Sequence, residues 1–432
     1  MVMESRIIGS KILTRNGFAI GNPQDISRAL LLAGNLFLLL ATYYVLKTVR
    51  EALILTEGGA EIKSYATAVQ ALLMLAILPL YGAAARRVCG ISLVRGITLL
   101  FILQLLVFSI FGMAGVQVGH AFFLWVGVFV IVIAQCWAFA GDLLPGGQGK
   151  RAFWMMGFGG ATGAWTGSWL AANWFAAFGP YRMMLLAAAL LFGSILLGCR
   201  SARSSPEVGK GGGASGDQSK PQPAQWRRYL LLIALLTILM NLVSSTGEYI
   251  FSKLVMIEAD RVIGSGVEAE VQRQAFVGQF YARFFGWTNL LGILLQLVCV
   301  PLILRRMCLP AALFILPAVT LAGYGALAAA PLLGLVQITK LLENSTDHSI
   351  QNTAVHALFL PAGREVKYQG QTVLETVFAR LGDLLHALLI FLGSRFAFGI
   401  TSYASINLIL TVAALLLVAV LYRENQKAAV WS

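Results

Sequence analysis

The sequence contains a series of apolar runs, each about 20 residues or longer, that begins near Arg28 and ends near Tyr422. A helix needs roughly 20 mostly apolar residues to cross the hydrocarbon core of a bilayer. Within that core a helix satisfies its own backbone hydrogen bonds. The runs therefore predict an all-α integral membrane protein in contact with a lipid bilayer. The composition agrees, since 58% of the residues are hydrophobic and 12% are charged.

These runs predict twelve membrane-spanning helices in two six-helix halves. The helices are expected at residues 28–55, 62–85, 92–115, 118–142, 151–175, 181–199, 229–256, 278–304, 309–330, 332–358, 371–396 and 401–422. Between the sixth and the seventh lies a stretch rich in Gly, Ser, Pro and charge, which cannot bury enough apolar surface to fold alone. We therefore predict an N-terminal half over 1–200, a cytoplasmic linker over 201–227 and a C-terminal half over 228–432.

Lys and Arg residues concentrate in every second loop between the predicted helices. The intervening loop at 115–119 has none, and the longest one, Ile257 to Phe276, mixes acidic and basic side chains. Because cytoplasmic loops carry an excess of Lys and Arg, we expect both termini and the linker on the cytoplasmic side of a multi-pass protein of the cell inner membrane. The net charge of +13 then reflects topology, and no nucleic acid partner is expected.

The cysteines and histidines do not indicate a metal site or a disulfide framework. The five cysteines show no CxxC spacing, and the four histidines show no ligand spacing with carboxylates or with one another. The sequence also shows no nucleophile and base arranged for catalysis. We therefore expect no metal, no cofactor and no enzymatic activity.

Two short stretches indicate that the two halves are repeats. "LLPGGQGKRAFW" begins at Leu143 and "FLPAGREVKYQG" begins at Phe359. Both contain an apolar-Pro-x-Gly core followed by a basic residue, at equivalent places in the two halves. Parallel repeats of this kind describe the two halves of major-facilitator-type transporters.

A ladder of glycines lies along the fifth predicted helix, at Gly159, Gly163 and Gly167. Small residues four apart let two helix backbones approach closely in a membrane, where lipid supplies no hydrophobic drive for association. The ladder predicts tight helix packing. A sliding surface for rocking halves is the alternative interpretation.

The first predicted helix contains "YYVLKTVREALIL", which places Lys47, Arg50 and Glu51 within an apolar run. At about 2.5–3.5 kcal/mol per central charge, the three cost roughly 8–10 kcal/mol on insertion. Roughly twenty apolar residues at about −0.3 to −0.6 kcal/mol each offset this cost, so the helix can insert. Tyr43, Lys47 and Arg50 share one helical face and would point an aromatic ring and two cations into the bundle. Alternatively, Lys47 and Arg50 snorkel to the surface while Lys47 pairs with Glu51.

The second half also carries charge inside its predicted helices. The charged residues in question are Glu248 and Lys253 on the seventh helix and Lys340, Glu343 and Asp347 on the tenth. Some charges are expected to neutralise one another as buried pairs, namely Lys340 with Glu343 or Asn344 and Arg380 with Asp383. The cations in excess need another partner, which predicts an anionic small-molecule substrate.

Four stretches of the chain share motifs with a known family of membrane proteins. They are "VLKTVREALILTEGGAEIKSY", "AQCWAFAGDLLPGGQGKRAFWMMGFGGATG", "NLVSSTGEYIFSKLV" and "LFLPAGREVKYQGQTVLETVFARLGD". Together they resemble the ATP:ADP antiporter (nucleotide transporter) family, which is related to the major facilitators. The resemblance implies ATP binding and nucleotide transport by antiport. It aligns the family's functional positions with Arg50, Glu51, Glu248, Lys253 and Lys367.

The chain departs from the family pattern at two polar positions. Gln135 stands where the family has an acid before the tryptophan of the fourth helix, and Gln371 stands where it has a lysine. Several cations act together on a polyphosphate, so these changes weaken the prediction of ATP and leave a nucleotide or other phosphorylated metabolite as the expected substrate.

We therefore predict a monomeric transporter that moves an anionic small molecule by alternating access. Lys47, Arg50 and Lys253 are the expected substrate cations, with Glu248 as their counter-ion or gate and Tyr43 as a stacking or hydrogen-bonding contact. The other expected substrate contacts are Glu51, Gln135, Lys340, Asp347, Lys367 and Gln371. The alternative is a sensor or assembly factor that keeps the fold and does not transport.

Overall fold

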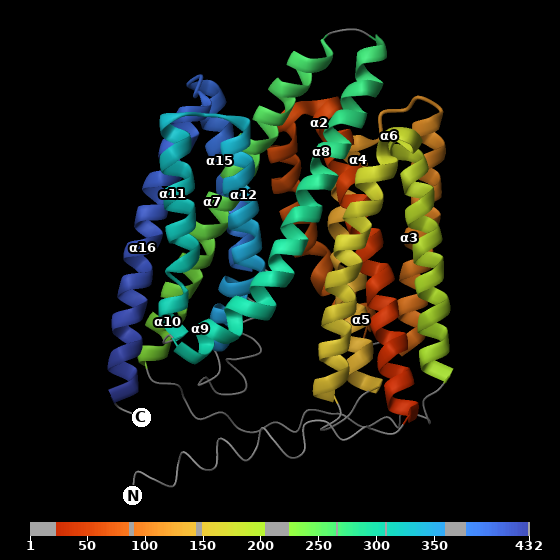
Figure 1. Ribbon diagram of the computed structural model, residues 1–432, viewed down its shortest axis with the longest axis horizontal. Helices are drawn as coiled ribbons and strands as arrows, with labels where there is room; N and C mark the ends of the chain where they lie inside the picture. Colours follow the sequence, from red (N-terminus) through yellow and green to blue (C-terminus); the bar gives the residue numbers. More distant parts are fainter. Residues whose placement is uncertain are drawn as a thin grey trace, which may run out of the picture.

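The computed structural model describes residues 23–85, 90–143, 149–203, 224–264, 267–306, 309–358 and 377–430, and the elements in these ranges are all helical (Figure 1). The N-terminal group of helices comprises α2 (Pro23–Ala85), α3 (Gly90–Met113), α4 (Gly119–Val128), α5 (Val130–Leu143) and α6 (Gly149–Arg203). Residues 204–223 of the predicted linker lie outside the described ranges.

The C-terminal group of helices extends from α7 to α16. It comprises α7 (Ala224–Ile263), α8 (Val267–Leu294), α9 (Val300–Arg306), α10 (Leu309–Ala312), α11 (Ile315–Ala329), α12 (Leu333–Thr346), α13 (Asn352–Leu358), α15 (Ala379–Arg395) and α16 (Ile400–Val430). Two π-helical turns interrupt it, η2 (Leu295–Cys299) and η3 (Asp347–Gln351). Figure 1 shows the two groups next to each other, with α8 running obliquely between them.

Two of the long helices turn back on themselves at a glycine. Gly59 in α2 has φ 73° and ψ −176°, and Gly179 in α6 has φ 69° and ψ 175°. Residues with a side chain rarely adopt such a positive φ, so glycine allows the chain to reverse there. Each of these helices therefore covers two of the spans expected from hydropathy.

The described helices have the length and surface of membrane-spanning segments. Seven of them are long and apolar enough to cross a membrane. Large apolar side chains such as Leu103, Ile110 and Leu416 are more than half exposed, as expected where a helix faces lipid. The prediction of an all-α, multi-pass membrane protein is confirmed.

The predicted loop from Ile257 to Phe276 is helical over most of its length. α7 continues to Ile263 and α8 begins at Val267, so the two helices extend well past their apolar spans. Hydropathy finds only the part of a helix that crosses lipid. It does not detect this polar extension, in which Glu258, Asp260 and Glu270 are compatible with a helix surrounded by water.

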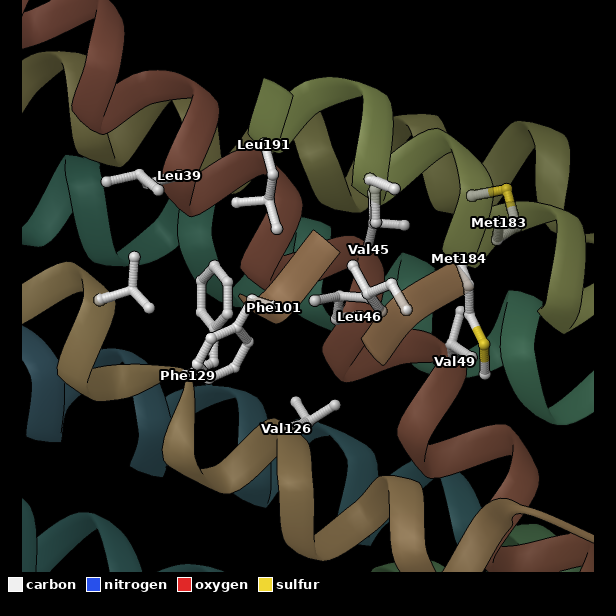
Figure 2. Packing of buried hydrophobic residues seen from close by; sticks show 14 of the residues in the cluster. Leu39, Val45, Leu46, Val49, Phe101, Val126, Phe129, Met183, Met184 and Leu191 are labelled. Carbon is white, nitrogen blue, oxygen red and sulfur yellow. The ribbon is translucent and has the colours of Figure 1, made fainter. Parts of the chain in front are cut away.

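The N-terminal group packs around an apolar core contributed by several helices. Leu39, Val45 and Leu46 of α2 are buried together with Phe101 of α3 and Phe129 (Figure 2). A second core joins the two groups of helices, because Ile54 and Phe123 pack in one cluster with Phe251, Tyr281 and Phe284 of α7 and α8. The two groups are thus in direct apolar contact.

The glycine ladder of α6 packs against the backbone of α2. A β-carbon added at Gly159 would lie 2.6 Å from the carbonyl oxygen of Ala33. The same holds at Gly163 and Gly167, which face the carbonyl oxygens of Phe37 and Ala41. The predicted tight packing is confirmed, and it fixes the arm of α2 that carries Lys47 against α6.

Candidate functional site

Lys47 lies between the two groups of helices without a direct ion pair to any residue that the structure describes. Its ammonium group is 4.3 Å from the centre of the Phe285 ring on α8 and 5.6 Å from that of Tyr44. An aromatic face attracts a cation and partly replaces a counter-ion. Tyr43, one turn earlier, stacks on Phe129 with the ring centres 6.1 Å apart. The positive charge of Lys47 is therefore held in place without being neutralised.

A chain of buried ion pairs lies one turn beyond Lys47. Glu51 is only 1% exposed, and its carboxylate is 2.6 Å from Arg50 Nη2 and 2.6 Å from Lys63 Nζ. Lys63 Nζ is also 3.1 Å from Glu248 Oε1 and donates a hydrogen bond of 2.8 Å to Ser252 Oγ. We call Arg50, Glu51, Lys63 and Glu248 the central ion-pair chain. It connects α2 to α7 and therefore joins the two groups of helices.

Lys63 is the central residue of this chain, and sequence reasoning did not single it out. It follows the Gly59 turn and belongs to the stretch that resembles the antiporter family, but its position in the sequence gives no sign of its partners. Glu248 is 185 residues away. The only available signal was the need of Glu51 and Glu248 for buried cations.

Lys253 lies apart from the central ion-pair chain. Its ammonium group donates to Tyr249 Oη at 3.1 Å and is 3.8 Å from Glu61. The side chain of Lys253 is 34% exposed and that of Glu61 is 49% exposed, so this pair is partly in water. The structure thus pairs Glu248 with Lys63, and the expected direct pairing of Glu248 with Lys47, Arg50 or Lys253 is not found among the described residues.

Lys340 is neutralised within the C-terminal group. It is 1% exposed and lies 2.7 Å from Glu343 Oε1, which confirms the predicted pair. Its ammonium group also donates to the Ser244 carbonyl oxygen at 3.0 Å, and Tyr324 Oη donates to Glu343 at 2.7 Å. The second predicted pair, between Arg380 and Asp383, is confirmed at 3.0 Å.

A cavity of about 360 Å³ lies within the C-terminal group. Its polar lining comes from α7, α12, η3 and α13, and consists mainly of Asn241, Ser244, Glu343, Asp347, His348 and Gln351. Asp347 is about half exposed and lies 3.7 Å from His348. Asp347 therefore lines a cavity, as expected of a substrate contact, but all the residues that line this cavity belong to the C-terminal group of helices.

The remaining predicted residues are not placed at the central ion-pair chain. Gln135 on α5 is 3% exposed, and its Nε2 and Oε1 atoms have no hydrogen-bond partner within the described part of the chain. Lys367 and Gln371 lie outside the described residues. Within the described ranges, no group of three or more His, Cys, Asp or Glu side chains is placed to hold a metal ion.

Comparisons with known proteins identify the fold and not a family. No family model and no curated protein matches the sequence. Among solved structures, the POT family transporter PepTSo is 12% identical with a TM-score of 0.66, and the match covers 96% of this chain and 100% of that one. The peptide transporter POT in complex with sulfate is 14% identical with a TM-score of 0.65, and the match covers 98% of both chains. A mutant of the nucleoside transporter NupG is 13% identical with a TM-score of 0.62, over 92% of this chain and 99% of that one.

These likenesses extend over nearly the whole chain and define its class of fold. The chain has the all-helical fold of major-facilitator-type transporters. The structures described as similar are all transporters or transporter homologues, which agrees with the prediction of a protein that is not an enzyme.

Proposed function

We propose that this protein is a secondary transporter that moves an anionic small molecule, a nucleotide or another phosphorylated metabolite, across a membrane by alternating access. The fold supports a transporter, since the likeness to transporters covers both groups of helices. The observation that carries the anionic substrate is the charge of Lys47, which no described carboxylate neutralises directly.

The charge balance around Lys47 supports an anionic substrate. Lys47 and the central ion-pair chain together contain three cations, Lys47, Arg50 and Lys63, and two carboxylates, Glu51 and Glu248. The difference, three minus two, leaves one positive charge on this set of side chains. A charge in a low-dielectric interior needs a partner, and an anionic solute would supply it.

The polar contacts between the groups suggest how transport proceeds. Lys63 contacts Glu248, Lys253 contacts Glu61, and Asn289 Nδ2 donates to Ser168 Oγ at 3.2 Å. The first two close the end of the molecule that carries the Gly59 turn, which topology predicts to be extracellular. An anion that binds Lys47 also competes with Glu248 for the nearby cations, weakens this closure and favours the state open at that end.

Uptake into proteoliposomes tests this proposal. Lys47→Gln removes the unpaired charge and should reduce uptake of the transported anion by at least about tenfold. That factor corresponds to a loss of about 1.4 kcal/mol in the interaction between the anion and the site. Lys47→Arg keeps the charge and should retain more uptake. Both variants should melt within a few degrees of the unaltered protein, because Lys47 has no direct ion pair to lose. Uptake of a nucleotide and metabolite panel that is unchanged by Lys47→Gln would reject the anion site. Binding without uptake would favour a sensor on the same fold.

The finer features of the proposal follow from the sequence. We propose twelve membrane crossings, two each for α2 and α6, with both termini on the cytoplasmic face of the cell inner membrane and a monomer as the working unit. Residues 1–200 and 228–432 would be the two rocking halves, joined by the 201–227 linker. Exchange of nucleotides, with ATP among them, is the specific activity that the resemblance to the antiporter family favours.

A further inference from the structure

The cavity of the C-terminal group has a charge opposite to that of the site around Lys47. Of the charged side chains along it, Glu343 is neutralised by Lys340. Asp347 has His348 as its described ionic partner, at 3.7 Å, and both side chains are at least half exposed. A pair at that distance and exposure is weak. The cavity therefore presents one carboxylate that is not fully compensated.

A second and independent feature points to a ligand that donates hydrogen bonds. Gln351 lines the cavity and is 6% exposed, and its Oε1 atom has no hydrogen-bond partner among the residues that the structure describes. A buried acceptor without a partner is unfavourable, because it has given up its hydrogen bonds to water. A donor group on a ligand would remove that cost. Asp347 and Gln351 are both acceptors, so the ligand group that complements them is a donor and preferably a cation.

The π-helical turn η3 brings these acceptors to the same wall. Asp347, His348 and Gln351 all belong to η3, and π-turns inside helices are frequent at functional sites. The lining also includes Leu236, Met240 and Leu316, which are apolar. At about 360 Å³ the cavity falls at the lower end of the range of small-molecule sites, roughly 300–1,000 Å³.

Resting on the proposed function, we propose that this cavity binds an amine of the transported solute, so that the substrate is a zwitterion with its anionic group at Lys47 and its ammonium group at Asp347 and Gln351. The two ends lie along the same stretch of α8: Lys47 Nζ is 4.3 Å from the Phe285 ring, and Ser345, two residues before Asp347, donates to the carbonyl oxygen of Thr288 at 3.1 Å. The apolar walls at Met240 and Leu316 would enclose the body of the solute. Substrates that have a phosphate or carboxylate but no ammonium group, nucleotides included, would bind less tightly than another phosphorylated metabolite that carries one.

Charge-selective labelling of single cysteines tests the electrostatic part of this proposal. The five native cysteines are first replaced by alanine. A single cysteine is then introduced by Asn352→Cys, at a position that lines the cavity. Cationic 2-aminoethyl and anionic 2-sulfonatoethyl methanethiosulfonate are compared, each relative to its rate with a free thiol. We expect the cationic reagent to be favoured by about tenfold or more, since a carboxylate a few ångströms away attracts the cationic reagent and repels the anionic one. Asp347→Asn should remove the preference.

The results separate this inference from the proposed function. Equal labelling, a preference for the anionic reagent, or no labelling at Asn352→Cys would overturn the amine site. Tyr43→Cys, next to Lys47, should instead favour the anionic reagent, and Lys47→Gln should abolish that preference. A failure at Tyr43→Cys alone would reject the anion site and leave the cavity assignment standing.

A matched pair of ligands tests the amine itself. O-phosphoethanolamine and ethyl phosphate differ by one amine, and each is added during labelling of Asn352→Cys by a neutral thiosulfonate. We expect O-phosphoethanolamine to slow labelling at least about threefold more than ethyl phosphate, and the two to act alike in Asp347→Asn. Equal slowing in the unaltered cavity would contradict an amine site.

Discussion

At the scale of single residues, the main feature is that Lys63 serves two carboxylates from different groups of helices. Glu51 is almost fully buried, whereas the side chain of Glu248 is 29% exposed. Glu51 therefore depends on its cations more strongly, because a buried charge cannot be stabilised by water. The ammonium group of Lys63 thus stabilises α2 through Glu51 and also connects the two groups of helices through Glu248.

Lys63→Met should destabilise the protein strongly. The substitution leaves Glu51 with Arg50 alone and leaves Glu248 without its described partner. Removing one partner of a buried pair typically costs about 3–5 kcal/mol, and we expect a loss in that range in the free energy of unfolding measured in detergent.

Lys253→Met is the matched control for Lys63→Met. The Lys253 pair with Glu61 is longer and partly exposed, so its loss should cost less than about 1 kcal/mol. The double variant Glu248→Gln with Lys63→Met should recover part of the stability, since Glu51 keeps Arg50 and the carboxylate left without its described partner is no longer charged. Similar losses for the two Met variants would contradict the central role of Lys63.

At the scale of elements, the contact between α2 and α6 determines where Lys47 lies. Three glycines of α6 face three carbonyl oxygens of α2, and this arm of α2 leads directly to Tyr43 and Lys47. The packing leaves no room for a side chain, so the position of α2 is defined by backbone contact. A shift of α2 would move the unpaired cation with it.

Gly163→Ala should destabilise the protein, and Gly157→Ala should not. A β-carbon at Gly163 would overlap the carbonyl group of Phe37, whereas nothing lies within 4 Å of one at Gly157 on the same helix. Overpacking typically costs about 1–3 kcal/mol. Alanine in place of an unconstrained helical glycine typically gains about 0.5–1 kcal/mol. Thermal melting in detergent measures both, and equal melting temperatures would show that the helices separate easily.

What the sequence could predict depended on distance along the chain. The pairs of Lys340 with Glu343 and of Arg380 with Asp383 are three residues apart, so helix geometry alone brings their side chains together. Lys63 and Glu248 meet only because two groups of helices pack against each other, and one sequence does not specify that packing. The spans of the helices were predictable from hydropathy, but the polar ends of α7 and α8 were not.

At the scale of the whole molecule, the described conformation is closed at the end with the Gly59 turn. Lys63 with Glu248 and Lys253 with Glu61 join the two groups of helices there. The apolar cluster of Ile54 and Phe123 with residues of α7 and α8 supports the same closure. In the proposed alternating access, these contacts would have to separate together.

We call Lys253 and Glu61 the outer pair. Reversing one of its charges should shift the conformational equilibrium toward opening at the end with the Gly59 turn. Lys253→Glu places two carboxylates opposite each other, and exposed pairs are worth about 0.2–1 kcal/mol, which corresponds to a population change of about 1.5- to 5-fold. Spin labels at Val116 and Phe396, both exposed, report the separation through distance distributions. The charge swap Lys253→Glu with Glu61→Lys should restore the original distribution. An unchanged distribution in Lys253→Glu would show that the outer pair does not contribute to closure.

The double attachment of Lys63 also determines what remains when the two groups part. Separation breaks its contact with Glu248 and leaves its contact with Glu51, which belongs to the same helix. Glu248 already reaches water and can be hydrated as it leaves. In the proposed alternating access, each of the two carboxylates of the central ion-pair chain would therefore keep either a cation or water as the groups separate, so strong closure and a low electrostatic barrier to opening are compatible.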